Sequence, residues 1–181
     1  MKKIFILVFT IASVALLAQN ETTPSFIPID NETQRIKFQE VVKEEGTEEE
    51  LFKRVVYWLN GYYKEPVRVT SVRDRPTGKF VGKHRFRIYY WDDDSIKHIG
   101  GMIHYTFTIE VKENRYRYTI DELLLKSKTR LQVEKWLDKS DPAYDPRWDS
   151  YLQQIADFVR EWSNTLKEKM KPEAKVEEEE W

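Results

Sequence analysis

The chain has 181 residues, and its 30 lysines and arginines against 31 aspartates and glutamates give a formal net charge of −1. This balance gives no bulk attraction to polyanions. The absence of cysteine excludes disulfides, thiolate metal ligands, a cysteine nucleophile and lipidation of an N-terminal cysteine. With 40% hydrophobic and 34% charged residues, the composition is typical of a folded protein and not of a disordered one.

The first residues have the order of a secretory signal peptide. Lys2 and Lys3 precede an uncharged apolar run from Ile4 to Leu17, and the small Ala18 is followed by polar residues. A membrane-spanning helix needs about 20 apolar residues, more than this run offers. We therefore predict an exported protein, periplasmic or secreted, that is cleaved near Ala18 or Gln19 and keeps no transmembrane segment. Loss of two lysines would leave 28 basic and 31 acidic residues, a net charge of −3.

The remaining chain is predicted to hold one folded domain. After the signal peptide, residues 1–19, we assign residues 20–34 to an N-terminal extension and residues 35–170 to a single α+β domain. Residues 171–181, with the run Glu177 to Glu180, have no apolar period and are predicted to be a flexible acidic tail. A length of about 160 residues suits one hydrophobic core.

A strand and a capped helix are the first predicted elements. Ile36 and Phe38 alternate with polar residues, as in a strand. Thr47 and Glu50 have the spacing of a capping box, in which the hydroxyl and the carboxylate bind amide groups of the first helical turn. Apolar residues then recur on one helical face, which predicts a helix from about Glu48 to Asn60.

Four strand-like runs follow with no helix between them. We expect them to form consecutive antiparallel hairpins, because turn residues separate them and Gly100 and Gly101 open the third. The four predicted strands are Val67 to Arg73, Phe80 to Trp91, Met102 to Val111, and Arg115 to about Leu124.

The C-terminal part predicts one long helix. Asp145 is placed to cap it, Pro146 suits its first turn, and apolar residues from Trp148 to Leu166 keep helical spacing. In the segment from Lys126 to Tyr144 the apolar residues have no clear helical or strand spacing, so we predict no helix or strand there. The order strand, helix, four strands, helix predicts an antiparallel sheet with two helices packed on one face and the other face open.

At this point the chain resembles the bacterial secreted domains known as domain of unknown function family 4468, whose fold is like that of the TATA-box-binding protein. The resemblance covers roughly Ile36 to Leu124 and the closing helix. It implies the TBP-like fold, and it carries over no functional residue because the family has no assigned chemistry. The matching segments are Thr47 to Leu59 (TEEELFKRVVYWL), Asp74 to Gly82 (DRPTGKFVG) and Val111 to Leu123 (VKENRYRYTIDEL).

Strand alternation predicts which side chains face the helices and which lie on the open face. Those facing the helices are Phe80, Phe86, Ile88, Ile103, Tyr105, Phe107, Ile109, Val111, Tyr116, Tyr118 and Ile120. The open face is predicted to be basic with aromatic interruptions, and its candidate binding residues are Lys83, Arg85, Arg87, Tyr89, Trp91, His104, Arg115 and Arg117. Lys37 and Arg68 share this parity, as do the acids Glu110 and Asp121.

Several interpretations of this basic face remain open. It can be a solvated sheet surface, whose lysines and arginines discourage edge aggregation. It can bind an anionic partner, such as a glycan, a lipid headgroup or an acidic protein segment, since arginine offers bidentate hydrogen bonds and Tyr89 or Trp91 a stacking surface. The acidic tail could fold back onto it, or two copies could pair through it. Nucleic acid is not expected, because fold does not imply function and an exported acidic protein rarely meets DNA.

Enzyme function has less support, and we predict no catalytic residue, metal ligand or cofactor. The one acidic cluster beside a histidine, Asp92 to Asp94 with His98, could hold a divalent cation, which leaves a cation-dependent enzyme or metal-binding protein as the alternative. Its spacing is not that of a calcium loop, and a solvated hairpin tip explains it. His84 is predicted to be a neutral core histidine, and the serines fit no nucleophile motif.

Overall fold

The computed structural model describes residues 24–126 and 130–172. All strands belong to one antiparallel sheet with the order β1-β5-β4-β3-β2, and β6 pairs with β5 farther along that strand. The predicted α+β class is confirmed. In chain order the elements are β1 (Phe38–Lys43), α1 (Glu48–Tyr62), α2 (Pro66–Val69), β2 (Thr70–Asp74), β3 (Lys79–Trp91), β4 (Lys97–Lys112), β5 (Arg115–Lys126), β6 (Arg130–Gln132), the 3-10 helix η1 (Val133–Leu137) and α3 (Arg147–Met170).

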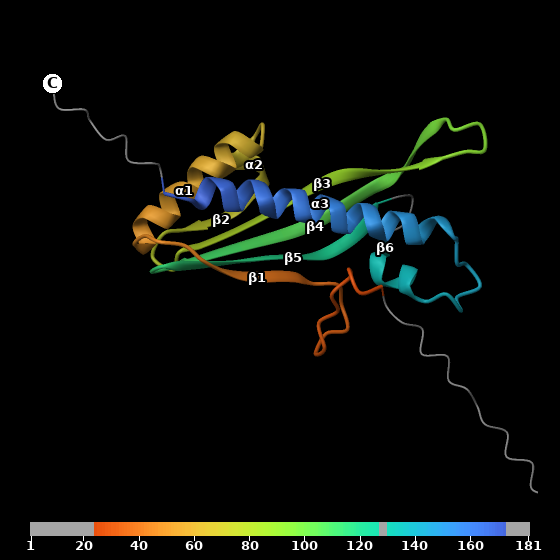
Figure 1. Ribbon diagram of the computed structural model, residues 1–181, viewed down its shortest axis with the longest axis horizontal. Coiled ribbons are helices and arrows are strands. Elements are labelled where there is room, and N and C mark those ends of the chain that lie inside the picture. The colour runs from red at the N-terminus through yellow and green to blue at the C-terminus, as the bar shows by residue number, and fades with distance from the viewer. Residues whose placement is uncertain (1–23, 127–129, 173–181) are drawn as a thin grey trace, which may run out of the picture.

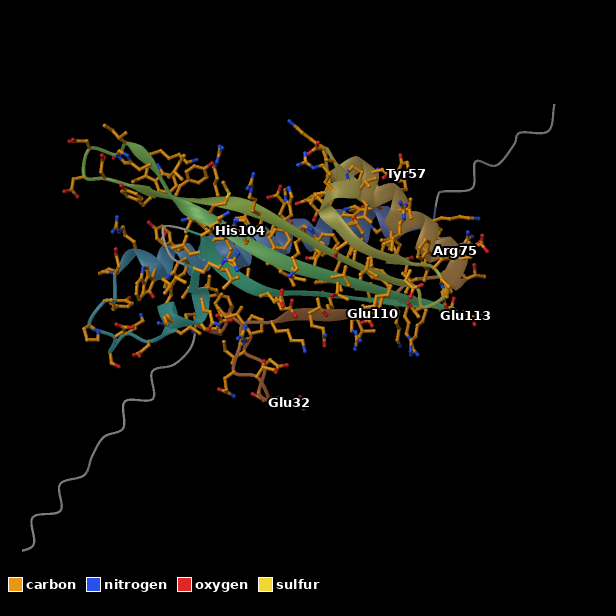
Figure 2. The ribbon with its side chains drawn as sticks, turned by 180° about the vertical axis from the view of Figure 1, so that it is seen from behind. Glu32, Tyr57, Arg75, His104, Glu110 and Glu113 are labelled. Carbon is orange, nitrogen blue, oxygen red and sulfur yellow. The ribbon has the colours of Figure 1, made fainter. Side chains whose placement is uncertain are left out.

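The molecule has two layers. Helices α1 and α3 lie on one face of the sheet, α3 running along the strands (Figure 1). Seen from behind, the strands lie in front of α3 and no described helix covers them (Figure 2). The predicted arrangement of two helices on one face is therefore present, and the other face is open over the described residues.

The core is filled by aromatic side chains between the layers. Trp58 of α1 and Trp162 of α3 meet edge to face with ring centroids 4.9 Å apart, and both are at most 2% exposed. Phe107 of β4 meets Trp162 from the sheet, and the hydroxyl of Tyr105 on the same strand contacts that of Tyr63. Every strand residue predicted to face the helices is buried, except Phe86, which is half-buried and stacks on Phe158 of α3.

Both main helices begin as their sequences predict. At α1 the capping box is complete, because Thr47 Oγ1 accepts from the Glu50 amide (3.2 Å) and Glu50 Oε2 accepts from the Thr47 amide (2.8 Å). At α3 Asp145 Oδ1 accepts from the Arg147 amide (2.9 Å), and Pro146 already has helical angles. These bonds satisfy amide groups that have no partner within the helix.

The second predicted strand and the start of the third differ from expectation. Residues 66–69 form the short helix α2, because Pro66 suits a first helical turn, and β2 begins only at Thr70. Strand β4 begins at Lys97, not at Met102. Gly100 and Gly101 lie inside it, where the pairing with β3 shifts register. A Cβ on Gly101 would come within 2.4 Å of Leu125, so the glycines allow a close approach instead of opening the strand.

The segment with no predicted element contributes to both the sheet and the core. Strand β6 extends the sheet beside β5, and η1 places Trp136, which is 0% exposed, against Trp148 and Tyr151 of α3. The described residues 133–137 pack on the helix side. Of the described helices, none is both long and apolar enough to cross a membrane. The predicted signal peptide and the run 177–180 lie outside the described residues.

Candidate functional site

The eight candidate binding residues are not brought together in one site. The structure divides them among three places along the open face: the far end of the β4–β5 hairpin, the tip of the β3–β4 hairpin, and the middle of the sheet, where His104 lies (Figure 2). Two further cations of the predicted face are already paired. Lys37 pairs with Asp30 at 3.1 Å, and Arg68 lies on α2, not on the sheet, and binds Glu65.

At the β4–β5 end, one of the two predicted arginines is paired with an acid. Arg117 Nε donates to Glu110 Oε2 at 3.0 Å, and these two side chains oppose each other across the strand pair. Arg115 lies beside them at the end of the strand, with the exposed Val41 on neighbouring β1. Cross-strand charge pairs of this kind are ordinary features of solvated sheets.

At the β3–β4 tip, the open face carries aromatic and aliphatic groups. Lys97 Nζ lies over the rings of Tyr89 (4.0 Å to the centroid) and Trp91 (5.5 Å). Trp91 and Ile99 are more than half exposed. This tip extends past the rest of the sheet (Figure 1), so its side chains are separated from the central cations along the strands.

The acidic cluster at this tip is engaged within the turn. Asp92 Oδ2 lies 2.7 Å from His98 Nε2, while its Oδ1 accepts from the amides of Asp94 and Ile96. The Asp92 carboxylate therefore closes the turn. The hydrogen bond with His98 is the largest cause of its lowered pKa. No group of three or more potential ligands occurs among the residues that the structure describes.

The middle of the open face holds a basic cup. We use this name for Lys83, Arg85, His104, Lys126 and Arg130, which line one side of a concavity of about 870 Å³. Arg85 and His104 are directly opposed on β3 and β4, and Lys126 and Arg130 are opposed on β5 and β6. The sequence analysis named Lys83, Arg85 and His104 as candidates and missed Lys126 and Arg130. Arg130 lies on β6, a strand that the spacing of apolar residues did not predict.

His104 shows how the cup's charges converge. Burial lowers the pKa of His104 below its ordinary value of 6.5, and Lys126, Arg85 and Arg130 lower it further. Its Nε2 atom is buried and has no hydrogen-bond partner among the described residues. Arg85, Lys126 and Arg130 form no ion pair within the described chain. Only Lys83 of the cup is paired, with Glu122 Oε2 at 3.2 Å.

Glu122 is the acid that the alternation rule did not place on this face. Strand β5 shifts register between its pairs with His104 and Thr106, and Glu122 takes φ 51 there. A non-glycine residue pays a steric cost in this conformation, and Glu122 is held in it by the hydroxyl of Thr106 at 2.6 Å. That bond is the main reason the Glu122 pKa is lowered. Asp121 beside it has a raised pKa, chiefly through burial.

The other side of the same concavity lies across the β3 edge and is aromatic. Tyr62, Tyr63 and Phe158 line it together with His84, and the charged residues Lys64, Glu65 and Arg68 also line the concavity. His84 is exposed, with its ring edge to face against Tyr63 at 5.0 Å, so the prediction that it is a core histidine is wrong. Its strand parity is that of the core, but β2 ends at the pair with Gly82, and the sheet edge leaves His84 open to solvent.

The fold and this site define an α+β domain in which two helices cover one face of an antiparallel sheet and the other face presents a basic hollow. Residues 38–125 match the model of the family described as domain of unknown function (DUF4468) with TBP-like fold. The suggested resemblance is thereby confirmed.

Two solved structures have the same fold. A DUF4468 family protein from Bacteroides ovatus ATCC 8483 has a TM-score of 0.67 at 11% sequence identity and covers 83% of this chain and 94% of its own. A TBP-like protein from Parabacteroides distasonis ATCC 8503 has a TM-score of 0.66 at 14% identity, with coverages of 80% and 97%. No curated protein matches the sequence. At such low identity the likeness concerns the fold alone.

Proposed function

We propose that the protein is an exported, non-enzymatic binding domain that takes an anionic partner in the basic cup. The observation that supports this most directly is the set of three cations, Arg85, Lys126 and Arg130, that converge on His104 without an ion pair in the described chain. A solvated sheet face normally carries mixed charges, and the Arg117–Glu110 pair at the other end of this sheet does so.

The cup offers the chemistry that carboxylate, sulfate and phosphate groups require. Arginine presents planar, bidentate hydrogen bonds, and lysine adds a flexible point charge. The buried Nε2 of His104 gains a partner when an anion enters. An anion would also offset the repulsion from Lys126, Arg85 and Arg130 that adds to burial in lowering the His104 pKa, so anion binding and His104 protonation favour each other.

Retention on a sulfated glycan matrix across a salt gradient tests the proposal. The protein without residues 1–19 is expected to elute above physiological salt, and a variant with Arg85→Glu and Lys126→Glu to pass through. The matched control carries Arg115→Glu and Arg117→Glu, which change the net charge equally outside the cup, and it should stay retained. Equal elution of the two variants would show that bulk charge alone, and no defined site, governs retention.

Export is a separate part of the proposal and has its own test. When the full chain is produced in a bacterium, the mature protein should begin at residue 19 or 20, which mass spectrometry of the intact protein determines. A Leu7→Arg change places a charge in the apolar run and should leave the precursor uncut. An intact precursor from the unchanged sequence would refute export with cleavage.

A further inference from the structure

We infer that the anionic partner is an extended acidic peptide that adds a strand to the free edge of β3, beside the basic cup. This inference rests on the proposed function and narrows it to one class of partner. The supporting feature is a stretch of sheet edge, Lys83 to Ile88, that lies between two covered positions.

The first covered position is set by β2. Its pairing with β3 ends at Thr70 and Gly82, whereas β3 continues to Trp91 (Figure 1). The second is set by α3, because the side-chain amide of Gln154 accepts from the Tyr89 amide at 2.9 Å and donates to the Tyr89 carbonyl at 2.8 Å. Gln154 thus occupies both backbone groups of one edge residue, as a neighbouring strand would.

Between these positions the direction of the backbone groups follows from strand geometry. The Val81 carbonyl faces β2, where it accepts from Ser71 Oγ, and the Tyr89 groups face Gln154 on the same edge. Backbone groups alternate in direction with period two. Lys83, Arg85 and Arg87 therefore direct their N–H and C=O groups to the free edge, and no described residue binds them.

The two walls of the concavity specify the side chains of an added strand. Residues that share a hydrogen-bonded antiparallel pair have side chains on the same face. Partners of Lys83, Arg85 and Arg87 would face the basic cup, where carboxylates are favoured. The alternate residues would face the aromatic side with His84, Phe86 and Phe158. The edge thus selects a segment that alternates acidic and apolar residues, a recognised mode of strand addition.

The direct test uses a capped hexapeptide with the sequence Val-Glu-Val-Glu-Val-Glu and two N-methylated forms of it. Methylation of the three glutamate nitrogens removes the donors that would bind β3, while methylation of the valine nitrogens leaves them. Charge and composition stay the same in both. We expect the glutamate-methylated peptide to bind at least about tenfold more weakly than the valine-methylated one.

Amide hydrogen exchange supplies the second readout. On adding the unmodified peptide, exchange should slow at Lys83, Arg85 and Arg87, and not at Arg115 or Arg117. A protein with Arg85→Glu and Arg87→Glu should lose this peptide and bind Val-Lys-Val-Lys-Val-Lys instead.

Three results would overturn the inference. Equal affinity for the two methylated peptides refutes strand addition and leaves anion binding at the cup standing. Retention on the glycan matrix without any peptide binding also refutes strand addition and leaves anion binding at the cup standing. If neither the matrix nor a peptide is bound, strand addition and the proposed function fail together.

Discussion

At the residue scale, a buried hydrogen-bond chain links the sheet to both helices. Trp162 Nε1 donates to the Tyr63 hydroxyl at 2.9 Å, and that hydroxyl lies 3.1 Å from the Tyr105 hydroxyl. All three residues are at most 4% exposed. A buried donor left without a partner costs about 1–3 kcal/mol. The effect of removing a hydroxyl on stability therefore depends on its place in this series of hydrogen bonds.

Removing the central hydroxyl should therefore destabilise more than removing the terminal one. Tyr63→Phe leaves the Trp162 N–H without an acceptor, and we expect it to lower the free energy of unfolding by about 1–3 kcal/mol. Tyr105→Phe leaves the Trp162 bond intact and should cost about 1 kcal/mol. Urea denaturation of the two variants checks this, and equal losses would contradict it.

These tyrosines also predict alkaline instability. Burial raises the pKa of Tyr62 to about 12 and those of Tyr63 and Tyr105 well above their ordinary range. In the unfolded chain tyrosine ionises near pH 10, so above this pH the unfolded state releases protons that the folded state retains, and stability falls. Unfolding midpoints in urea should be flat from pH 7 to 9 and drop above pH 10. The Tyr105→Phe variant should show a smaller drop.

At the scale of elements, two glycines give a matched test of packing. A Cβ at Gly82 would lie 2.2 Å from the ring of Phe107 and 2.9 Å from the Val69 carbonyl, whereas a Cβ at Gly61 meets nothing within 4 Å. Gly82→Ala should cost at least about 1–3 kcal/mol through overpacking. Gly61→Ala, in the last turn of α1, should stabilise by about 0.5–1 kcal/mol. Thermal unfolding followed by circular dichroism measures both, and stabilisation by Gly82→Ala would refute the packing account.

Most elements follow from the period of their apolar residues, while the irregular points do not. The helix from Glu48 and the strand from Arg115 begin where capping and turn residues predict. The register shift at Glu122 could not be predicted, because it depends on tertiary contacts of a residue whose type rarely takes a positive φ. This shift is why Glu122 was not expected on the open face. Part of the basic cup could be predicted, because Lys83 and Arg85 follow regular strand alternation. Arg130 could not, because it lies on β6, which the sequence did not indicate.

At the scale of the whole molecule, both ends of the described chain contribute to the core. Ile27 and Ile36 precede β1 and are 3% and 0% exposed, and Met170 at the end of α3 is 0% exposed. The Met170 carbonyl also accepts from Arg54 of α1 at 2.8 Å. The folded unit therefore extends to Met170, the last residue of α3.

We expect residues 24–172 to fold alone in one cooperative transition. Far-ultraviolet circular dichroism and tryptophan fluorescence should report coincident unfolding curves. A shorter chain ending at residue 164 loses Leu166 and Met170, both fully buried, and should be less stable by several kcal/mol. Similar midpoints for the two chains would show that the last turns of α3 add little.

The free stretch of β3 also has a consequence for the solubility of the protein. Unpaired strand edges are the usual starting points of aggregation, because two copies can join edge to edge. Here such a dimer would place Lys83, Arg85 and Arg87 of one molecule opposite the same three cations of the other, and repulsion would oppose the contact. The side chains that suit this edge to an acidic strand thus make it a poor template for its own copies, so the edge can stay open in a concentrated solution of the protein.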